Sequence, residues 1–153
     1  MNLLDEYKEA TGRVEPGEYA RYLQSVTLLG LVLDSVSAEA NRQCLQEGND
    51  LKLKINRDFR LVHEDALRPI ILLDYVILGM VGRKQAIRIK ATYRIQLGSP
   101  EALPADFLVI YGRSSADMQV WPFLRELAFS LTNRMAITQM TLPLLTSPQR
   151  LDR

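Results

Sequence analysis

The stretch that decides the fold is residues 70–97, IILLDYVILGMVGRKQAIRIKATYRIQL. Its first part, residues 70–81, is rich in isoleucine, leucine and valine, which favours a strand. From residue 85 to residue 97, apolar side chains fall on odd positions and mostly polar or basic ones on even positions. This alternation is typical of a half-buried strand. Because residues 82–84 leave room only for a tight turn, we expect the two strands to form an antiparallel hairpin.

Two more strands are predicted before this hairpin. Residues 51–63 alternate in the same way, with apolar side chains at most odd positions. Residues 25–37 are apolar on both faces, so this strand needs cover on both sides, from this chain or from another copy of it. Gly30 in its middle indicates a bulge or the close approach of another backbone. The polar residues 38–50 are interpreted as a long connection.

Helical patterns flank the predicted strands. A short helix over residues 105–111 is expected to end at Gly112, and a longer helix is expected to open at Pro122 and to end near Met135. The order of elements predicts one α+β domain, a four-stranded antiparallel sheet with two C-terminal helices packed on one face. Its parts are an N-terminal helical segment (1–24), the sheet (25–97), the helices (104–136) and an apolar, then polar tail (137–153).

The composition fits a globular chain of ordinary charge. Of the 153 residues 47% are apolar and 24% are charged, and the formal net charge is +1. Such a chain can bury a core, and it has no overall attraction to nucleic acid or to an anionic membrane. The N-terminus lacks the basic and apolar regions of a signal peptide, and no apolar run reaches the length of a membrane span. The expected location is therefore cytoplasmic.

Residues for catalysis or metal binding are sparse. The chain has one histidine, His63, and one cysteine, Cys44, and it has no glycine-rich phosphate loop. Asp74 lies inside an apolar strand, where it is either a functional carboxyl with a raised pKa or an ordinary carboxylate that faces solvent or pairs with a base. We therefore expect that the protein is not an enzyme and that it binds no metal ion and no cofactor. A ligand-binding or catalytic domain that uses Asp74 or His63 is the competing hypothesis.

The C-terminal part has more apolar side chains than one helix face can bury. Trp121, Phe123 and Phe129 lie on the long helix, and Met118, Met135 and Met140 lie near them in sequence. Flexible methionines suit surfaces that accept varied partners, although they also fill gaps in cores. This excess predicts an apolar surface for other polypeptides, or for self-association.

The even positions of two predicted strands form a basic face. If the odd positions face the core, the solvent side carries a set of five bases: Lys52, Lys54, Arg88, Lys90 and Arg94. RNA-binding sheets interleave bases with stacking aromatic residues, but here Asn56, Thr92 and Gln96 lie between them. A solvated face or a site for an acidic protein partner is therefore favoured over a nucleic-acid site.

Residues 120–143, VWPFLRELAFSLTNRMAITQMTLP, resemble the C-terminal part of the SecB family of protein-export chaperones. In that family an aromatic-Pro-aromatic and Arg-Glu motif opens the long helix, and a polar-Arg turn and an apolar tail with proline follow it. The predicted order of strands also fits, so the resemblance covers residues 25–145. The family's aromatic-Pro at the turn is replaced here by Ile137 and Thr138. The matching residues are Trp121, Pro122, Phe123, Arg125 and Glu126 at the opening, and Asn133, Arg134, Leu142 and Pro143 at the end.

The resemblance implies a tetramer, a dimer of dimers, that works without ATP or a cofactor. Apolar grooves, formed in part by residues 38–50, would hold unfolded or precursor polypeptides for export. SecB proteins present carboxylates on the sheet to the translocase motor SecA, whereas this chain has bases there and a pI of about 7.8. These bases argue against docking to SecA, which stays an open alternative. Two further hypotheses stay open, a chaperone dedicated to an antitoxin and a purely structural oligomer subunit. The client-binding residues implied are Leu31, Leu33, Leu51, Leu53, Trp121, Phe123, Met140 and Leu142.

Overall fold

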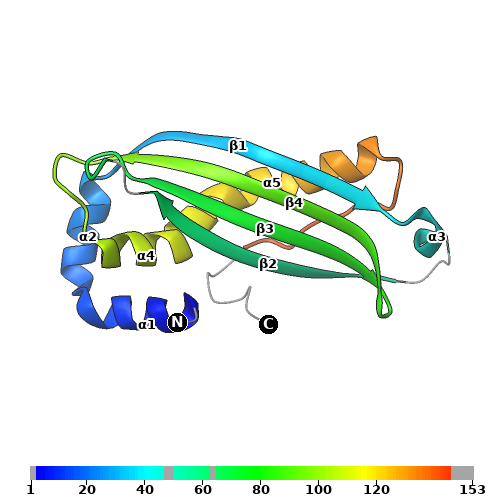
Figure 1. Ribbon diagram of the computed structural model, residues 1–153, viewed down its shortest axis with the longest axis horizontal. Helices are drawn as coiled ribbons and strands as arrows, with labels where there is room; N and C mark the ends of the chain where they lie inside the picture. Colours follow the sequence, from blue (N-terminus) through cyan, green and yellow to red (C-terminus); the bar gives the residue numbers. More distant parts are fainter. Residues whose placement is uncertain (1–2, 47–49, 63–64, 146–153) are drawn as a thin grey trace.

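The computed structural model describes residues 3–46, 50–62 and 65–145 of the chain. Figure 1 shows a long four-stranded sheet with helices at one end and behind it. The elements are α1 (Leu3–Arg13), α2 (Pro16–Ser25), β1 (Thr27–Ala40), α3 (Arg42–Leu45), β2 (Leu51–Val62), β3 (Ile70–Val81), β4 (Lys84–Gly98), α4 (Ala105–Arg113) and α5 (Ser115–Arg134). This is the α+β architecture that the sequence predicts.

The predicted hairpin lies at the centre of the sheet. All pairs are antiparallel in the order β1-β4-β3-β2, so β1 and β2 form the two edges. Gly82 has a φ of +61° at the first of the two turn residues, a conformation that favours glycine and the tight turns of hairpins. Odd-numbered residues of β3, and those of β4 from Ile87 to Leu97, are buried. For β4 this is what the alternation in the sequence predicts.

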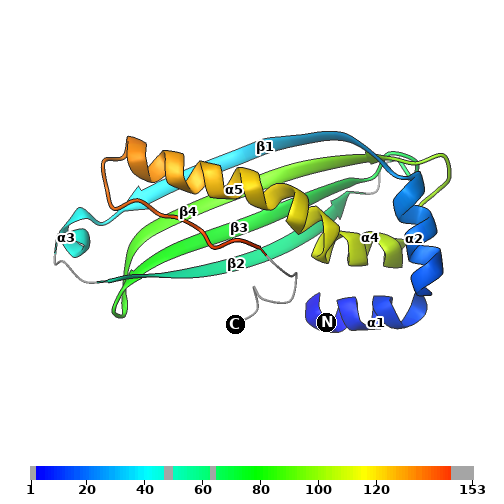
Figure 2. The same cartoon turned by 180° about the vertical axis from the view of Figure 1, so that it is seen from behind.

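One face of the sheet is covered and the other is open. Helix α5 crosses the covered face, here called the inner face, and the segment after α5 runs back along it (Figure 2). The opposite face, here called the outer face, has no helix over it in the described part of the chain (Figure 1). At one end of the sheet α1 and α2 pack on α4, where the Phe107 ring centroid lies 5.1 Å from that of Tyr19 and 5.5 Å from that of Tyr22.

Strand β1 differs from its prediction in length and in phase. It continues to Ala40, three residues beyond the predicted end, and the predicted connection also contains the short helix α3. The pairing with β4 shifts at Leu29 and again at Asp34. Each bulge adds one residue and reverses the alternation. Most apolar residues of β1 therefore point to the inner face, namely Leu28, Leu31, Leu33, Val36 and Ala38, which pair with odd-numbered residues of β4.

The two C-terminal helices do not begin and end where glycine and proline predicted. Helix α4 runs through Gly112 because this residue packs against Phe59, and a Cβ atom added at position 112 would lie 2.9 Å from the Phe59 Cδ2 atom. Helix α5 begins at Ser115, so Pro122 lies inside it. An interior proline removes one backbone hydrogen bond, but the buried stripe of Ala116, Val120 and Leu124 continues past it and holds the helix on the sheet.

A buried ion pair ties the start of α5 to the sheet. Arg57 of β2 pairs with Asp117 of α5, and their side chains are only 7% and 2% exposed. The Tyr75 hydroxyl of β3 donates a hydrogen bond to the Asp117 Oδ1 atom at 2.5 Å. Burial raises the pKa of Tyr75, so the phenol stays protonated and remains a donor. In the sequence, Arg57 stands at an odd position of β2, where the alternation places side chains toward the core. A charged residue at such a position indicates a buried partner of opposite charge.

Candidate functional site

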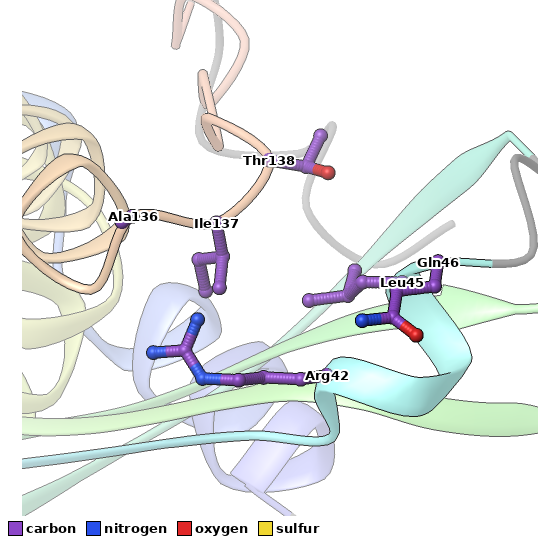
Figure 3. A pocket seen from close by; sticks show the side chains of 6 residues that line it. All are labelled: Arg42, Leu45, Gln46, Ala136, Ile137 and Thr138. Atoms are coloured by element: carbon purple, nitrogen blue, oxygen red, sulfur yellow. The ribbon is translucent and has the colours of Figure 1, made fainter.

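A pocket lies where the connection between β1 and β2 meets the end of α5. It has a volume of about 270 Å³ and is lined by Arg42, Leu45, Gln46, Ala136, Ile137 and Thr138, here called the α3 pocket (Figure 3). In Figure 3 the side chains of Leu45 and Ile137 approach each other above Arg42. Gln46 and Thr138 add polar groups. A pocket with a small apolar centre and polar edges suits a peptide segment, whose apolar side chain fills the centre while its backbone amide groups meet the edges.

Hydrogen bonds fix both walls of the α3 pocket. The Asn41 side chain accepts a hydrogen bond from the Cys44 backbone N–H at 3.2 Å and so caps α3, while the Asn41 N–H donates to the Ala86 carbonyl at 2.7 Å. The Arg42 Nη2 atom donates to the Met135 carbonyl at 2.7 Å, and this bond joins α3 to the residue that follows α5. The pocket is therefore held open between two anchored elements.

The segment after α5 is part of the core. The Trp121 Nε1 atom donates to the Pro143 carbonyl at 2.8 Å, and the Arg125 Nε atom donates to the Leu142 carbonyl at 2.9 Å. The Met140 N–H donates to the Thr132 hydroxyl at 3.1 Å. A Cβ atom added at Gly79 would lie 3.3 Å from the Met140 Cε atom, so this segment sits directly on β3.

The structure does not bring the eight predicted client-binding residues into one groove. Trp121, Met140 and Leu142 are buried, with 3%, 1% and 1% exposed. Phe123 and Leu33 are exposed, at 54% and 40%, but they lie on different elements. The remaining residues, Leu31, Leu51 and Leu53, are half-buried.

Sequence reasoning missed most of the α3 pocket. Ile137 and Thr138 stand out in the sequence only as a departure from the SecB turn, and residues 38–50 only as a polar connection. Leu45 is the one leucine in that connection, and this was the available signal. Cys44, which lies in the predicted polar connection, is a buried residue of α3. His63 lies outside the described residues.

The edge strand β1 presents a second apolar surface. Five of its large apolar side chains are 40–54% exposed, although several of them point to the inner face. Helix α5 runs obliquely across the inner face and reaches β1 only near the C-terminal end of the helix, so the first part of this edge strand has no helix over it (Figure 2). A long apolar edge strand with unpaired backbone groups is a surface for pairing with another chain. These residues, here called the β1 strip, are Leu28, Leu29, Val32, Leu33 and Val36.

The outer face carries the predicted bases and a paired carboxylate. All five predicted bases are exposed there. Asp74 accepts two hydrogen bonds from Arg60, at 2.8 and 3.0 Å, and one from the Thr92 hydroxyl at 2.7 Å. The bonds from Arg60 lower the pKa of Asp74 against a smaller opposing effect of burial. Of the two alternatives for Asp74, the structure therefore supports the carboxylate that pairs with a base.

Metal-binding clusters and membrane-spanning helices are both absent from the described residues. Within residues 3–46, 50–62 and 65–145, no group of three or more His, Cys, Asp or Glu side chains is arranged to hold a metal ion. In the same part of the chain, no helix has the length and apolarity to cross a membrane.

With this sheet order and its long C-terminal helix, the chain has the fold of a SecB-like chaperone. A similar structure is that of the Mycobacterium tuberculosis SecB-like chaperone Rv1957 in complex with a ChAD peptide from the Rv1956 HigA1 antitoxin. It matches with a TM-score of 0.71 and 13% sequence identity, over 94% of this chain and 98% of that chain. The predicted resemblance to SecB-like proteins is thereby confirmed for the fold.

A second solved structure is more distantly similar. A protein of unknown function from Streptococcus agalactiae matches with a TM-score of 0.44 and 14% identity, over 78% of this chain and 97% of that chain. No protein-family model and no curated protein matches the chain.

Proposed function

We propose that the protein is a chaperone that binds segments of unfolded polypeptides and works without ATP. The observation that carries this proposal is the exposed apolar surface, namely the β1 strip and the α3 pocket, on a fold shared with a SecB-like chaperone. Monomeric proteins rarely leave so much apolar surface together without a partner for it.

The α3 pocket is the proposed anchor for a client. Leu45 and Ile137 offer apolar contact, and the edge of the pocket offers hydrogen-bonding groups to an extended backbone. Each apolar side chain that is buried contributes about 25 cal/mol per Å². A single pocket of this size gives weak binding, so tight binding requires several such pockets to act on one client chain. A homo-oligomer supplies them.

The β1 strip is the proposed contact between copies of the chain. An edge strand of 14 residues with exposed leucine and valine is incompletely covered within one protomer. Pairing of β1 with another copy would satisfy its backbone groups and bury these side chains. We propose a tetramer, a dimer of dimers. Of the eight residues predicted to bind clients, Trp121, Met140 and Leu142 lie in the core, and the others are half-buried or exposed.

An antitoxin is a specific candidate for the client. The similar chaperone Rv1957 holds a peptide from the HigA1 antitoxin in its solved structure. A role in protein export is the broader hypothesis, but the bases on the outer face argue against a SecB-like contact with SecA. Binding to many unrelated unfolded proteins with similar affinity would argue against a dedicated antitoxin chaperone.

The proposal is tested with an unfolded model protein that aggregates on dilution from denaturant. The wild-type chain is expected to slow aggregation at stoichiometric amounts without ATP. The double variant Leu45→Gln/Ile137→Gln loses apolar contact and should bind the client about tenfold more weakly, which corresponds to about 1.4 kcal/mol.

A matched control uses an exposed leucine elsewhere. Leu67→Gln changes an exposed residue that lies outside the α3 pocket, and it should leave client binding unchanged. Failure of the wild-type chain to slow aggregation even in stoichiometric excess would contradict the proposed function.

A further inference from the structure

The outer face is divided into a balanced half and a basic half. In the balanced half, the negative charge of Asp74 is paired with Arg60, and Asp74 also accepts a hydrogen bond from Thr92. Arg94 of β4 lies opposite Leu72 of β3. The half near the β3–β4 turn has four exposed bases, here called the basic patch: Lys52, Lys54, Arg88 and Lys90. None of the ion pairs within the described residues uses any of these four.

The basic patch has an apolar centre. Strand pairing places Leu78 of β3 between Lys54 of β2 and Arg88 of β4. Along the same strand Val76 lies opposite Lys90, and Met80 lies opposite Lys52. These three apolar side chains are half-buried and face outward. The patch is thus a row of apolar side chains on β3 with a row of bases on each side.

The basic patch has fewer acidic neighbours than bases, since, of the described carboxylates, only Glu39 and, through its effect on Lys90, Asp74 act on the four bases. Glu39 of β1 lies opposite Arg88, and it is the one carboxylate that strand pairing places beside the four bases. The chain as a whole has a net charge of +1, so the bases are concentrated locally rather than spread over the surface. This local excess of positive charge attracts an acidic partner and steers its approach.

We infer that the basic patch binds an acidic amphipathic helix of a partner protein, on the face of the sheet opposite the client pocket. Adjacent strands lie about 4.8 Å apart, so the bases of β2 and β4 are about 10 Å apart across β3. A helix with its side chains is about 10–12 Å wide, so a helix along β3 reaches both rows. Its apolar stripe packs on Val76, Leu78 and Met80, and carboxylates on both flanks of the stripe meet the bases.

Nucleic acid fits the patch less well than such a helix. The outward residues between the bases include no aromatic side chain on which a nucleotide base can stack. The apolar row on β3 would make no favourable contact with the charged phosphate groups of a nucleic acid. An extended acidic peptide directs its face-contacting side chains along one line, so it meets one row of bases at a time.

The experiment uses the full chain and a fluorescent synthetic helix of about 18 residues, roughly 27 Å long, with a leucine stripe flanked by glutamates on both sides. Fluorescence anisotropy at low salt should show binding that weakens as salt screens the charges. The Lys54→Glu/Arg88→Glu variant should bind at least about tenfold more weakly. Leu78→Gln should also weaken binding, although it changes no charge. A peptide with glutamines in place of its glutamates should not bind.

Three controls make the outcome decisive. Lys8→Glu/Arg68→Glu makes the same change of charge at exposed positions outside the patch and should leave binding of the helix unchanged. Leu45→Gln/Ile137→Gln should also leave it unchanged, since the α3 pocket and the basic patch share no residue. The inference is wrong if the glutamate helix does not bind the wild-type chain at about 1 mM. It is also wrong if a single-stranded oligonucleotide binds the chain as tightly as the helix does and Leu78→Gln does not change the affinity for the helix.

Discussion

At the scale of single residues, the buried pair of Arg57 and Asp117 has the largest expected effect on stability. The pair lies under α5, and the Tyr75 hydroxyl completes the contacts of Asp117. Removal of one partner leaves a buried charge without compensation and costs about 3–5 kcal/mol. Asp117→Asn should therefore lower the free energy of unfolding strongly in a urea titration.

The double variant Arg57→Met/Asp117→Leu serves as the control for that prediction. It removes both charges and keeps the side-chain volume, so it should be more stable than either single variant. A single variant within about 0.5 kcal/mol of wild type would show that the pair contributes little to folding.

Asp74 gives a prediction about pH. Its folded pKa lies below the ordinary value of 3.8 because Arg60 donates hydrogen bonds to the charged carboxylate. The resulting stabilisation is complete above pH 3.8 and is lost as the pH falls through the lower folded pKa. Because the Asp74 and Arg60 side chains are 25% and 58% exposed, we expect less than about 1 kcal/mol.

The comparison of wild type with Asp74→Asn isolates this contribution. Free energies of unfolding from urea titrations should differ near neutral pH and converge as the pH falls below about 3.8. A difference that grows on acidification would show that the sign of the coupling is wrong.

At the scale of helices and strands, Gly112 shows how close packing overrides a local rule. Glycine usually breaks helices, yet α4 continues through Gly112 because Phe59 occupies the space of a side chain. Gly112→Ala should destabilise the protein by about 1–3 kcal/mol through overpacking. Thermal unfolding measures this directly.

Two further variants test the cause of that loss. Phe59→Leu in the Gly112→Ala background should recover part of the stability, because the smaller side chain makes room for the methyl group. Gly17→Ala, in α2, meets no atom within 4 Å and should not destabilise the protein. Equal losses at both glycines would point to the backbone rather than to Phe59.

The strands show which parts of the fold the sequence could predict. Alternation placed β2 and β4 correctly, because each has one side toward the core and its period survives pairing. The richness of residues 70–81 in isoleucine, leucine and valine placed β3 correctly. Strand β1 was interpreted as apolar on both faces because its bulges at Leu29 and Asp34 depend on pairing with β4, which is remote in sequence. The predicted boundaries of α4 and α5 were wrong for a similar reason. Tertiary contacts stabilise the helical conformation at Gly112 and at Pro122, and these contacts are not visible in the local sequence.

At the scale of the whole molecule, the candidate site was harder to predict than the fold. The residues of the α3 pocket come from two segments that lie far apart in sequence and meet only when β1 and α5 end near each other. Taken singly, Leu45 and Ile137 are ordinary apolar residues. The aromatic motif of α5 supports the resemblance to SecB, yet its Trp121 lies in the core.

Each of the three surfaces has a separate proposed role. The β1 strip joins copies of the chain, the α3 pocket holds a client, and the basic patch on the outer face receives an acidic helix. The client pocket and the basic patch are separate, so variants in one should leave the function of the other intact.

The most direct test of the chaperone proposal is a photo-crosslinking measurement on the intact assembly. A photoreactive residue is placed at position 45, in the α3 pocket, or at position 67, outside it, and an unfolded client is added without ATP. We predict a crosslink to the client from position 45 and little from position 67. A client that crosslinks equally from both positions, or from neither, would contradict the account.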